Sequence, residues 1–255
     1  MIAVPYHLGR RDVEVGRGPI RILQALARPC QIVERAGSSS NELDAVVDVN
    51  TQLARTVAQH ECPAVILAGN CNSCVGTLAG LARKDVGIVW FDAHGDFNTP
   101  ETTISGALEG MSLAIATGGC HDDLRRRIGL DHPVSEQNCI LVATRSLDPK
   151  EAIRLERSAI TVVGLSALNA ALDVLSKRVS VVYLHLDLDV LDPALSPGVN
   201  FQAPGGIDPE ALYEAVRGIP AKIPIAAATI ANFNPDRDHS DRTLRIASRL
   251  VEILQ

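Results

Sequence analysis

Residues 86–91 (VGIVWF) run directly into residues 92–96 (DAHGD), and this junction decides the fold. The apolar run has the length and the β-branched content of a buried strand. A second junction repeats the arrangement, because residues 181–186 (VVYLHL) lead into residues 187–189 (DLD). Acidic side chains at the ends of buried strands are costly unless a cation compensates them. The two junctions therefore predict a metal site on a sheet.

Strand-like and helical patterns alternate along the whole chain. The expected strands are 2–7, 30–35, 63–68, 86–91, 139–144, 160–164, 179–187 and 224–231. The expected helices are 19–28, 42–59, 74–83, 108–117, 149–158, 166–177, 208–217 and 240–254. This alternation predicts an α/β fold, a three-layer α/β/α sandwich with a mostly parallel eight-stranded sheet. A chain of 255 residues can bury one large core, so we expect a single domain over residues 1–255.

Composition and charge exclude several classes of protein. A formal charge of −6 without a basic run argues against nucleic-acid binding. The N-terminus leads into a strand-like segment, and no apolar run is long enough to cross a membrane, so we expect neither a secretory signal nor a membrane partner. The six cysteines, Cys62 among them, show no paired CxxC pattern, so a disulfide framework or zinc ribbon is not expected. A reducing cytoplasm is the expected location.

Ligands of doubly wound sheets bind outside the carboxyl ends of the strands. Five segments with polar side chains are expected there: 69–72, 92–96, 145–148, 187–192 and 232–234. Alternation in an extended segment projects Asp92, His94 and Asp96 to one side. Carboxylates can bridge two cations, and an imidazole suits Mn, Fe, Co, Ni or Zn better than Ca or Mg. Two such ions about 3.5–4 Å apart can activate a shared water, which predicts a two-metal hydrolase rather than ordinary polar loops.

These motifs resemble a known family. Residues 92–106 (DAHGDFNTPETTISG) closely resemble the signature of the arginase/agmatinase (ureohydrolase) superfamily, and residues 185–193 (HLDLDVLDP) resemble its second metal motif. Residues 16–19 (GRGP) resemble its N-terminal Gly-Pro turn, and residues 232–235 (NFNP) fall where its last active-site strand ends. The resemblance spans nearly the whole chain and implies an arginase-like fold.

The resemblance also implies a binuclear manganese centre that hydrolyses a small-molecule guanidino substrate. Asp92 and Asp187 would bridge two Mn²⁺ ions, and Asp96 would pass the proton of the attacking water to the leaving amine. From arginine the products would be ornithine and urea. Family relatives form trimers or hexamers, so a homo-oligomer is expected. The full set of implied metal ligands is Cys71, Asp92, His94, Asp96, Asp187 and Asp189.

Substrate-binding residues can be carried over in the same way. Asn98 and Ser105 match residues that bind the α-carboxylate in the arginase branch, and Asp148 matches the acid that meets the α-amino group. Ala107 stands where arginases have another asparagine. The resemblance thus favours an α-amino acid over a decarboxylated amine such as agmatine, unless Asn98 and Ser105 are merely turn residues.

Three residues depart from the family pattern. Cys71 replaces a histidine ligand. A Cys71 thiolate would favour Zn, Fe or Co over Mn more than the family's usual ligand set does. The alternative is an inert thiol that packs in the core. Glu109 replaces a histidine thought to shuttle protons, and it is either an acid/base group or a solvated glutamate at a helix start. Asn232 replaces a glutamate that pairs with the guanidinium, a loss of about 1.5–3 kcal/mol of binding and orientation.

These departures leave alternatives open. A less basic N-hydroxyguanidine would suffer less from Asn232, and cysteine-liganded relatives that hydrolyse N-hydroxyarginine to hydroxyurea are known in the superfamily. A metal-poor binding or regulatory member is a non-enzymatic alternative, although retention of the costly acids argues against it. His185 is either a hydrogen-bond partner behind the ligands or a core residue.

Overall fold

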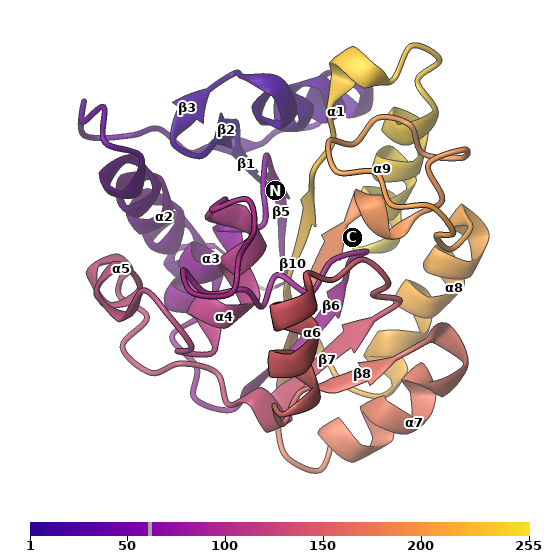
Figure 1. Cartoon of the computed structure of the whole chain (residues 1–255). Coiled ribbons are helices and arrows are strands. Elements are labelled where there is room, and N and C mark those ends of the chain that lie inside the picture. Colours follow the sequence, from indigo (N-terminus) through magenta and orange to yellow (C-terminus); the bar gives the residue numbers. More distant parts are fainter. Residues whose placement is uncertain (61–62) are drawn as a thin grey trace.

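A central parallel sheet with helices on both faces forms the molecule (Figure 1). The computed structural model describes residues 1–60 and 63–255. The sheet has eight strands in the order β4-β1-β5-β10-β9-β6-β7-β8, and its pairings within the described residues are all parallel. The predicted three-layer fold is confirmed, with a sheet more uniformly parallel than expected. The strands are β1 (Ile2–Val4), β4 (Gln31–Ile32), β5 (Ala64–Ala68), β6 (Val86–Phe91), β7 (Cys139–Val142), β8 (Thr161–Val163), β9 (Val181–Asp187) and β10 (Ile225–Ala231).

The helices divide between the two faces of the sheet (Figure 1). One face is covered by α2 (Glu42–Ala58), α3 (Ser73–Leu81), α4 (Ser112–Ala116) and α5 (Asp122–Ile128), with α6 (Pro149–Glu156) adding Leu155 to the same side. The other face is covered by α1 (Gly18–Leu26), α7 (Leu165–Leu175), α8 (Pro209–Gly218) and α9 (Arg242–Ile253). Each face therefore has its own apolar core.

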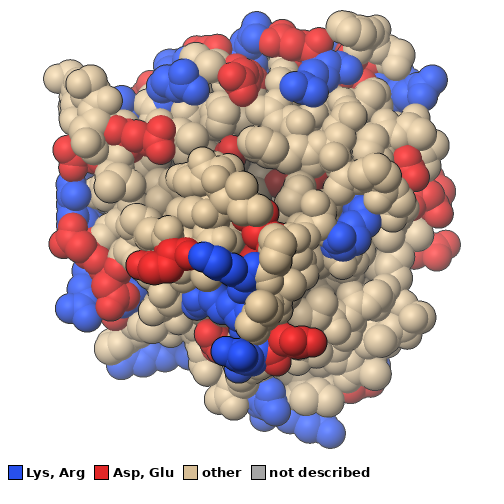
Figure 2. Space-filling view, in the orientation of Figure 1, with Lys and Arg blue, Asp and Glu red and all other residues tan. Residues whose placement is uncertain are grey.

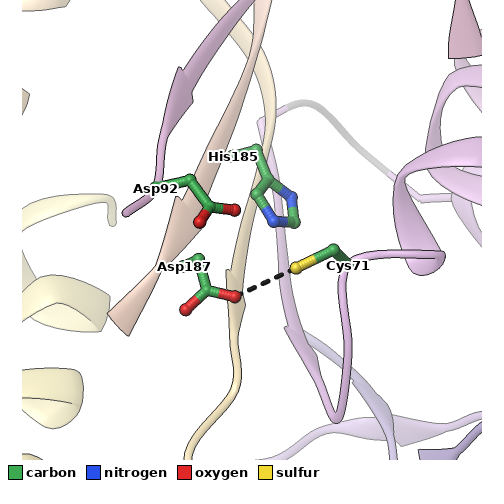
Figure 3. Close-up of side chains that lie close together, drawn as sticks. All are labelled: Cys71, Asp92, His185 and Asp187. Carbon is green, nitrogen blue, oxygen red and sulfur yellow. Dashed lines mark hydrogen bonds between the residues drawn. The ribbon is translucent and has the colours of Figure 1, made fainter. Parts of the chain in front are cut away.

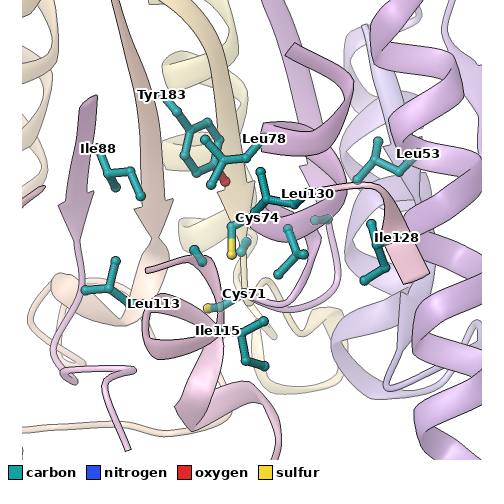
Figure 4. Close-up of a cluster of buried hydrophobic side chains, with 14 of the residues drawn as sticks. Leu53, Cys71, Cys74, Leu78, Ile88, Leu113, Ile115, Ile128, Leu130 and Tyr183 are labelled. Atoms are coloured by element: carbon teal, nitrogen blue, oxygen red, sulfur yellow. The ribbon is translucent and has the colours of Figure 1, made fainter. Parts of the chain in front are cut away.

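The core under the first face reaches the carboxyl edge of the sheet. Tyr183, Cys74, Leu113 and Cys71 all belong to this core, and Figure 4 shows Cys71 below Cys74. Cys74 is fully buried, in agreement with the packing role expected for a small apolar side chain. Since an apolar layer supports the strand ends from below, polar groups at this edge are held away from bulk water.

Two local features were not predicted. The expected strand 2–7 is interrupted at Pro5, and Tyr6–His7 (β2) instead forms a hairpin with Arg10–Arg11 (β3). Helix α5 was missed because its charged sequence offers only Leu124 and Ile128 as an apolar pair.

Within the described ranges, no helix combines the length and the apolar character needed to cross a bilayer. The cysteines of these ranges are free thiols, at positions 30, 71, 74, 120 and 139. Cys62 lies outside the described residues.

Candidate metal centre

A cavity of about 270 Å³ opens at the carboxyl edge of the sheet. In the space-filling view a hollow lies near the centre of the face, and acidic side chains are visible inside it (Figure 2). The size is close to the lower end of the range for small-molecule sites. Every site residue expected from the sequence lines this cavity: Cys71, Asp92, His94, Asp96, Asn98, Ser105, Glu109, Asp148, Asp187, Asp189 and Asn232.

Four side chains form an inner group at the floor of the cavity: Cys71, Asp92, His185 and Asp187. One ligand atom from each lies within 4.8 Å of the others, and all four residues are buried. They come from the loop after β5, the end of β6 and two positions of β9 (Figure 3). The Cys71 thiol donates a hydrogen bond to Asp187 Oδ2 at 3.0 Å.

A second, outer group shares Asp92 with the first. It consists of Asp92, His94 and Asp189, whose ligand atoms also lie within 4.8 Å of one another. His94 Nδ1 is 3.1 Å from Asp189 Oδ2 and 3.5 Å from Asp92 Oδ1. The His94 side chain is 29% exposed, so this group faces the open cavity. One carboxylate common to both groups is the arrangement expected of a residue that bridges two ions.

Hydrogen bonds from backbone N–H groups and from an indole hold the carboxylates of Asp92 and Asp189 in place. Asp92 accepts from the backbone N–H of His94 at 2.7 Å and from Trp90 Nε1 at 3.0 Å. Asp189 Oδ1 accepts from the backbone N–H of Ala93 at 3.0 Å. These bonds follow from the short turns after β6 and β9 and orient the oxygens before any ligand arrives.

Arg145 ties the outer turn to a neighbouring loop, a role that sequence reasoning missed. Its guanidinium donates to the carbonyl oxygens of Asp189 at 2.9 Å and Val190 at 3.0 Å. It also donates to the carbonyl oxygen of Ala203 at 2.8 Å. A single arginine in a loop carries no sequence signal for such a contact, because its acceptors are backbone groups.

The acids of the site have strongly perturbed pKa values. Burial, together with the nearby charges of Asp189 and Asp92, raises the pKa of Asp187 well above its usual range. Burial and the charge of Asp92 raise the pKa of Asp189 to about 6. Asp96 behaves in the same way, and its Oδ2 is buried without a hydrogen-bond partner. Several carboxylates thus compete for too little positive charge.

His94 supplies part of the missing charge. Burial opposes protonation of this imidazole, but Asp189 and Asp92 outweigh burial and raise the pKa of His94 to about 12. Burial alone would also raise the pKa of Asp92, yet the contact with His94 lowers it overall. The unsatisfied Asp96 oxygen and the crowded acids, with imidazole and sulfur donors beside them, fit divalent transition-metal ions. Asp96 belongs to neither ligand group, so its place in a metal shell stays a prediction.

Asn232 lies between the two groups. Its side-chain Nδ2 donates to Asp187 Oδ1 at 2.9 Å and to Asp189 Oδ2 at 3.1 Å. Its backbone has a left-handed φ of 69°, a conformation that asparagine tolerates better than most residues. The amide therefore neutralises no charge but joins the inner group to the outer one.

The residues expected to bind the substrate's amino-acid end form one wall of the cavity. Asp148 Oδ2 accepts from Asn98 Nδ2 at 3.2 Å and from the backbone N–H of Ile104 at 3.1 Å. Ser105 is exposed, and its hydroxyl accepts from the backbone N–H of Ala107 at 3.1 Å. The buried carboxylate of Glu151 accepts the backbone N–H groups of Phe97 and Asp148, so it holds this wall together.

Glu109 is paired rather than solvated. Its Oε2 lies 3.5 Å from His7 Nε2, and its side chain is 14% exposed. The nearby Glu109 carboxylate is the main reason why the pKa of His7 is raised. The sequence alone indicates no functional role for His7, since the residues that meet here come from distant parts of the chain.

A doubly wound parallel sheet with two adjoining ligand groups at its carboxyl edge places this protein among the α/β metal hydrolases that use paired divalent ions. The arginase family model matches residues 4–254. Arginase from Bacillus subtilis (strain 168) is 32% identical over 293 aligned residues, which cover 100% of this chain and 96% of the relative. Arginase from Bacillus caldovelox is 30% identical, with 98% and 95% covered.

Solved structures agree with the sequence comparison. The arginase structure from Bacillus subtilis superposes with a TM-score of 0.86 at 30% identity and covers 100% of this chain and 98% of its own. The structure from Bacillus caldovelox gives a TM-score of 0.87 at 28% identity, with 99% and 96% covered. The chain belongs to the arginase family and is a metal-dependent hydrolase that acts on C–N bonds of amidines.

Proposed function

We propose that this enzyme hydrolyses the guanidino group of an arginine-like α-amino acid, which for arginine would give ornithine and urea. Two divalent ions, Mn²⁺ by analogy with the family, would be held by Cys71, Asp92, His94, Asp187 and Asp189, with Asp96 nearby. One observation carries the proposal: the two ligand groups share Asp92 at the floor of a cavity whose wall presents Asn98, Ser105 and Asp148.

The protein groups around the ions would each have a distinct task. Two divalent ions bound here would lower the pKa of a water molecule and so supply the nucleophile. Asp96 would accept the proton of the attacking water and pass it to the leaving amine, since its buried Oδ2 has no hydrogen-bond partner among the described residues. Cys71 must lose the proton that it now donates to Asp187 before its sulfur can bind a metal.

The wall opposite the ions would orient the substrate. Asn98 and Ser105 would donate to the α-carboxylate, and Asp148 would accept from the α-ammonium group. Glu109 and His7 would exchange protons between this cavity and solvent, because they form a pair at its rim. A decarboxylated amine would leave Asn98 and Ser105 without their partner.

N-hydroxyarginine is the second candidate, favoured by Asn232. Its amide already donates to Asp187 and Asp189 and offers no negative charge to a guanidinium. A neutral partner costs a cationic substrate about 1.5–3 kcal/mol relative to a charged one. An N-hydroxyguanidine is less basic and would lose less.

Ornithine release from arginine and N-hydroxyarginine, measured in parallel with Mn-reconstituted protein, tests both candidates. Putrescine release from agmatine is the control for the α-carboxylate and α-amino contacts. We expect turnover of at least one α-amino acid and little turnover of agmatine. Asp187→Ala should abolish metal loading and turnover together. If the enzyme binds two ions but releases no ornithine from either amino acid, the proposed substrate class is refuted.

Location and assembly stay predictions that follow from the family. We propose a cytoplasmic enzyme that assembles into a homotrimer or hexamer. Sedimentation equilibrium of the Mn-loaded chain would test the assembly, and a monomer at micromolar concentration would contradict it.

A further inference from the structure

His185 occupies a place in the inner group that no argument from the sequence assigned to it. Its side chain is fully buried on β9, two residues before Asp187. Because strand residues i and i+2 share a face, Tyr183, His185 and Asp187 project to the same side of the sheet. In Figure 3 the imidazole is turned toward Cys71 and Asp187, with Asp92 on its other flank.

The two ring nitrogens of His185 have different surroundings. Nδ1 lies 2.9 Å from the hydroxyl of Tyr183, whereas Nε2 is buried without any hydrogen-bond partner. A buried polar atom without a partner is rare and costly, so it calls for an explanation. A histidine that served only for packing would leave this cost unopposed.

Metal ligation would satisfy Nε2. In a tetrahedral shell, bonds of about 2.0–2.3 Å place the ligand atoms about 3.3–3.8 Å apart. The atoms offered by Cys71, Asp92, His185 and Asp187 lie within 4.8 Å of one another, so side-chain shifts of up to about 1 Å would bring them to one ion. A sulfur, an imidazole nitrogen and two carboxylate oxygens make a complete tetrahedral set.

The ring is also held as a ligand would be. Metal-binding histidines use their second nitrogen for a hydrogen bond that fixes the ring orientation, and here Tyr183 provides that bond to Nδ1. Trp90 stacks on the imidazole with ring centroids 3.7 Å apart and an angle of 16° between the planes. Trp90 also donates to Asp92 Oδ2, so one side chain orients two members of the group.

We infer that His185 is a direct ligand, through Nε2, of the ion held by Cys71, Asp92 and Asp187. This inference deepens the proposed function and rests on its two-metal centre. It gives the inner ion one sulfur and one imidazole ligand, a softer shell that selects Zn, Co or Fe over Mn at this position. Asp96 is then not needed to complete the inner shell and remains available for proton transfer.

Cobalt(II) titration of the metal-stripped full chain tests the assignment, because a thiolate–cobalt bond has its own charge-transfer absorption. His185→Phe keeps an aromatic ring against Trp90 but removes the ligand nitrogen. We expect it to weaken the cysteine-bound cobalt at least about tenfold. His94→Phe is the matched control and should weaken the other ion while the thiolate band persists. Wild-type affinity and an unchanged band in His185→Phe would overturn the inference.

A second measurement does not depend on how His185→Phe folds. His94→Ala leaves His185 as the imidazole of the two ligand groups, so X-ray absorption with one equivalent of cobalt should show one sulfur and one imidazole. Sulfur without imidazole, or no cobalt bound, would refute the assignment. If cobalt has an imidazole ligand but the enzyme releases no ornithine from arginine or N-hydroxyarginine, the proposed substrate class is wrong and the ligand assignment stands.

Discussion

The inner and outer halves of the candidate metal centre share Asp92 but differ in their surroundings. The inner half, with Cys71 and His185, is fully enclosed and rests on the apolar core (Figures 3 and 4). The outer half, with His94 and Asp189, opens to the cavity through the partly exposed imidazole. The departure from the family's ligand pattern at Cys71 thus lies in the more deeply buried half.

This difference suggests a division of labour. A buried shell can exchange one ligand type for another with little change at the mouth of the cavity, because its members lie close together against the core. The outer shell cannot change so freely, since it shapes the surface on which a guanidino group would lie. The inner half would then set which metal is bound, and the outer half which substrate is cleaved.

Removing the carboxylate common to both halves should have the largest effect. We expect Asp92→Asn to lose both ions and to lower kcat at least about 10³-fold, because each half loses a charged ligand. Metal analysis and ornithine release would measure this. Asp238→Asn is the control and should keep both ions; Asp238 is a buried acid that accepts backbone N–H groups in the first turn of α9. If Asp92→Asn kept one ion at full affinity, the halves would not share this ligand.

Asn232 connects the halves, and changing it should sharpen their roles. Asn232→Glu should raise kcat/KM for arginine about 10- to 100-fold, because it restores a negative partner for the guanidinium. It should raise kcat/KM for N-hydroxyarginine less. Asn234→Asp adds a charge at a buried position that does not line the cavity, and it should leave both values unchanged. No gain in Asn232→Glu, with both ions intact, would contradict the role of this position.

The pH dependence of stability should reveal the crowded acids in metal-free protein. The pKa of Asp189 rises from about 3.8 in an unfolded chain to about 6 in the folded one. The folded state therefore binds more protons between these values, and its stability falls as pH rises through them. The raised pKa of His94 acts in the same direction at higher pH. The titration of Asp189 alone should lower the free energy of unfolding by about 3 kcal/mol as pH rises through the whole range.

Urea denaturation of metal-free protein at pH 4.5 and pH 7.5 measures about 2 kcal/mol of this change, because part of the titration lies below pH 4.5. Asp189→Asn should reduce the difference, and two bound ions should reverse its sign. A metal-free protein that is more stable at pH 7.5 would show that the carboxylates are already compensated within the protein.

Glu109 lines the cavity but belongs to neither ligand group, and its replacement should have the smallest effect. Glu109→Gln should lower kcat about tenfold without changing the content of either ion, because only proton exchange with solvent is slowed. Added imidazole buffer should restore part of the rate. Glu14→Gln is the control, since Glu14 also lies 3.5 Å from His7 but is half exposed and outside the cavity. Equal losses in both variants would assign the effect to His7.

Much of the architecture could be predicted from local patterns. The eight strands of the sheet follow from apolar runs, and the polar segments after β5, β6 and β9 were expected at one edge because parallel strands end together. Helix α5 and the β2–β3 hairpin could not be predicted, since neither has a clear apolar period. Their positions depend on packing against the rest of the chain.

The sequence by itself determined which chemical groups meet at the sheet edge, because Asp92, Asp187 and Asp189 lie at or just beyond the ends of two parallel strands, and parallel strands end at the same edge. Only the tertiary structure decided how those groups are partnered. Cys71 and Asp187 are 116 residues apart, and Asn232 reaches Asp187 across 45 residues. The free Nε2 of His185 likewise emerges only when Tyr183 and Trp90 close around the ring. The contacts of Cys71, Asn232 and Trp90 join side chains from different strands and loops, which no local pattern encodes.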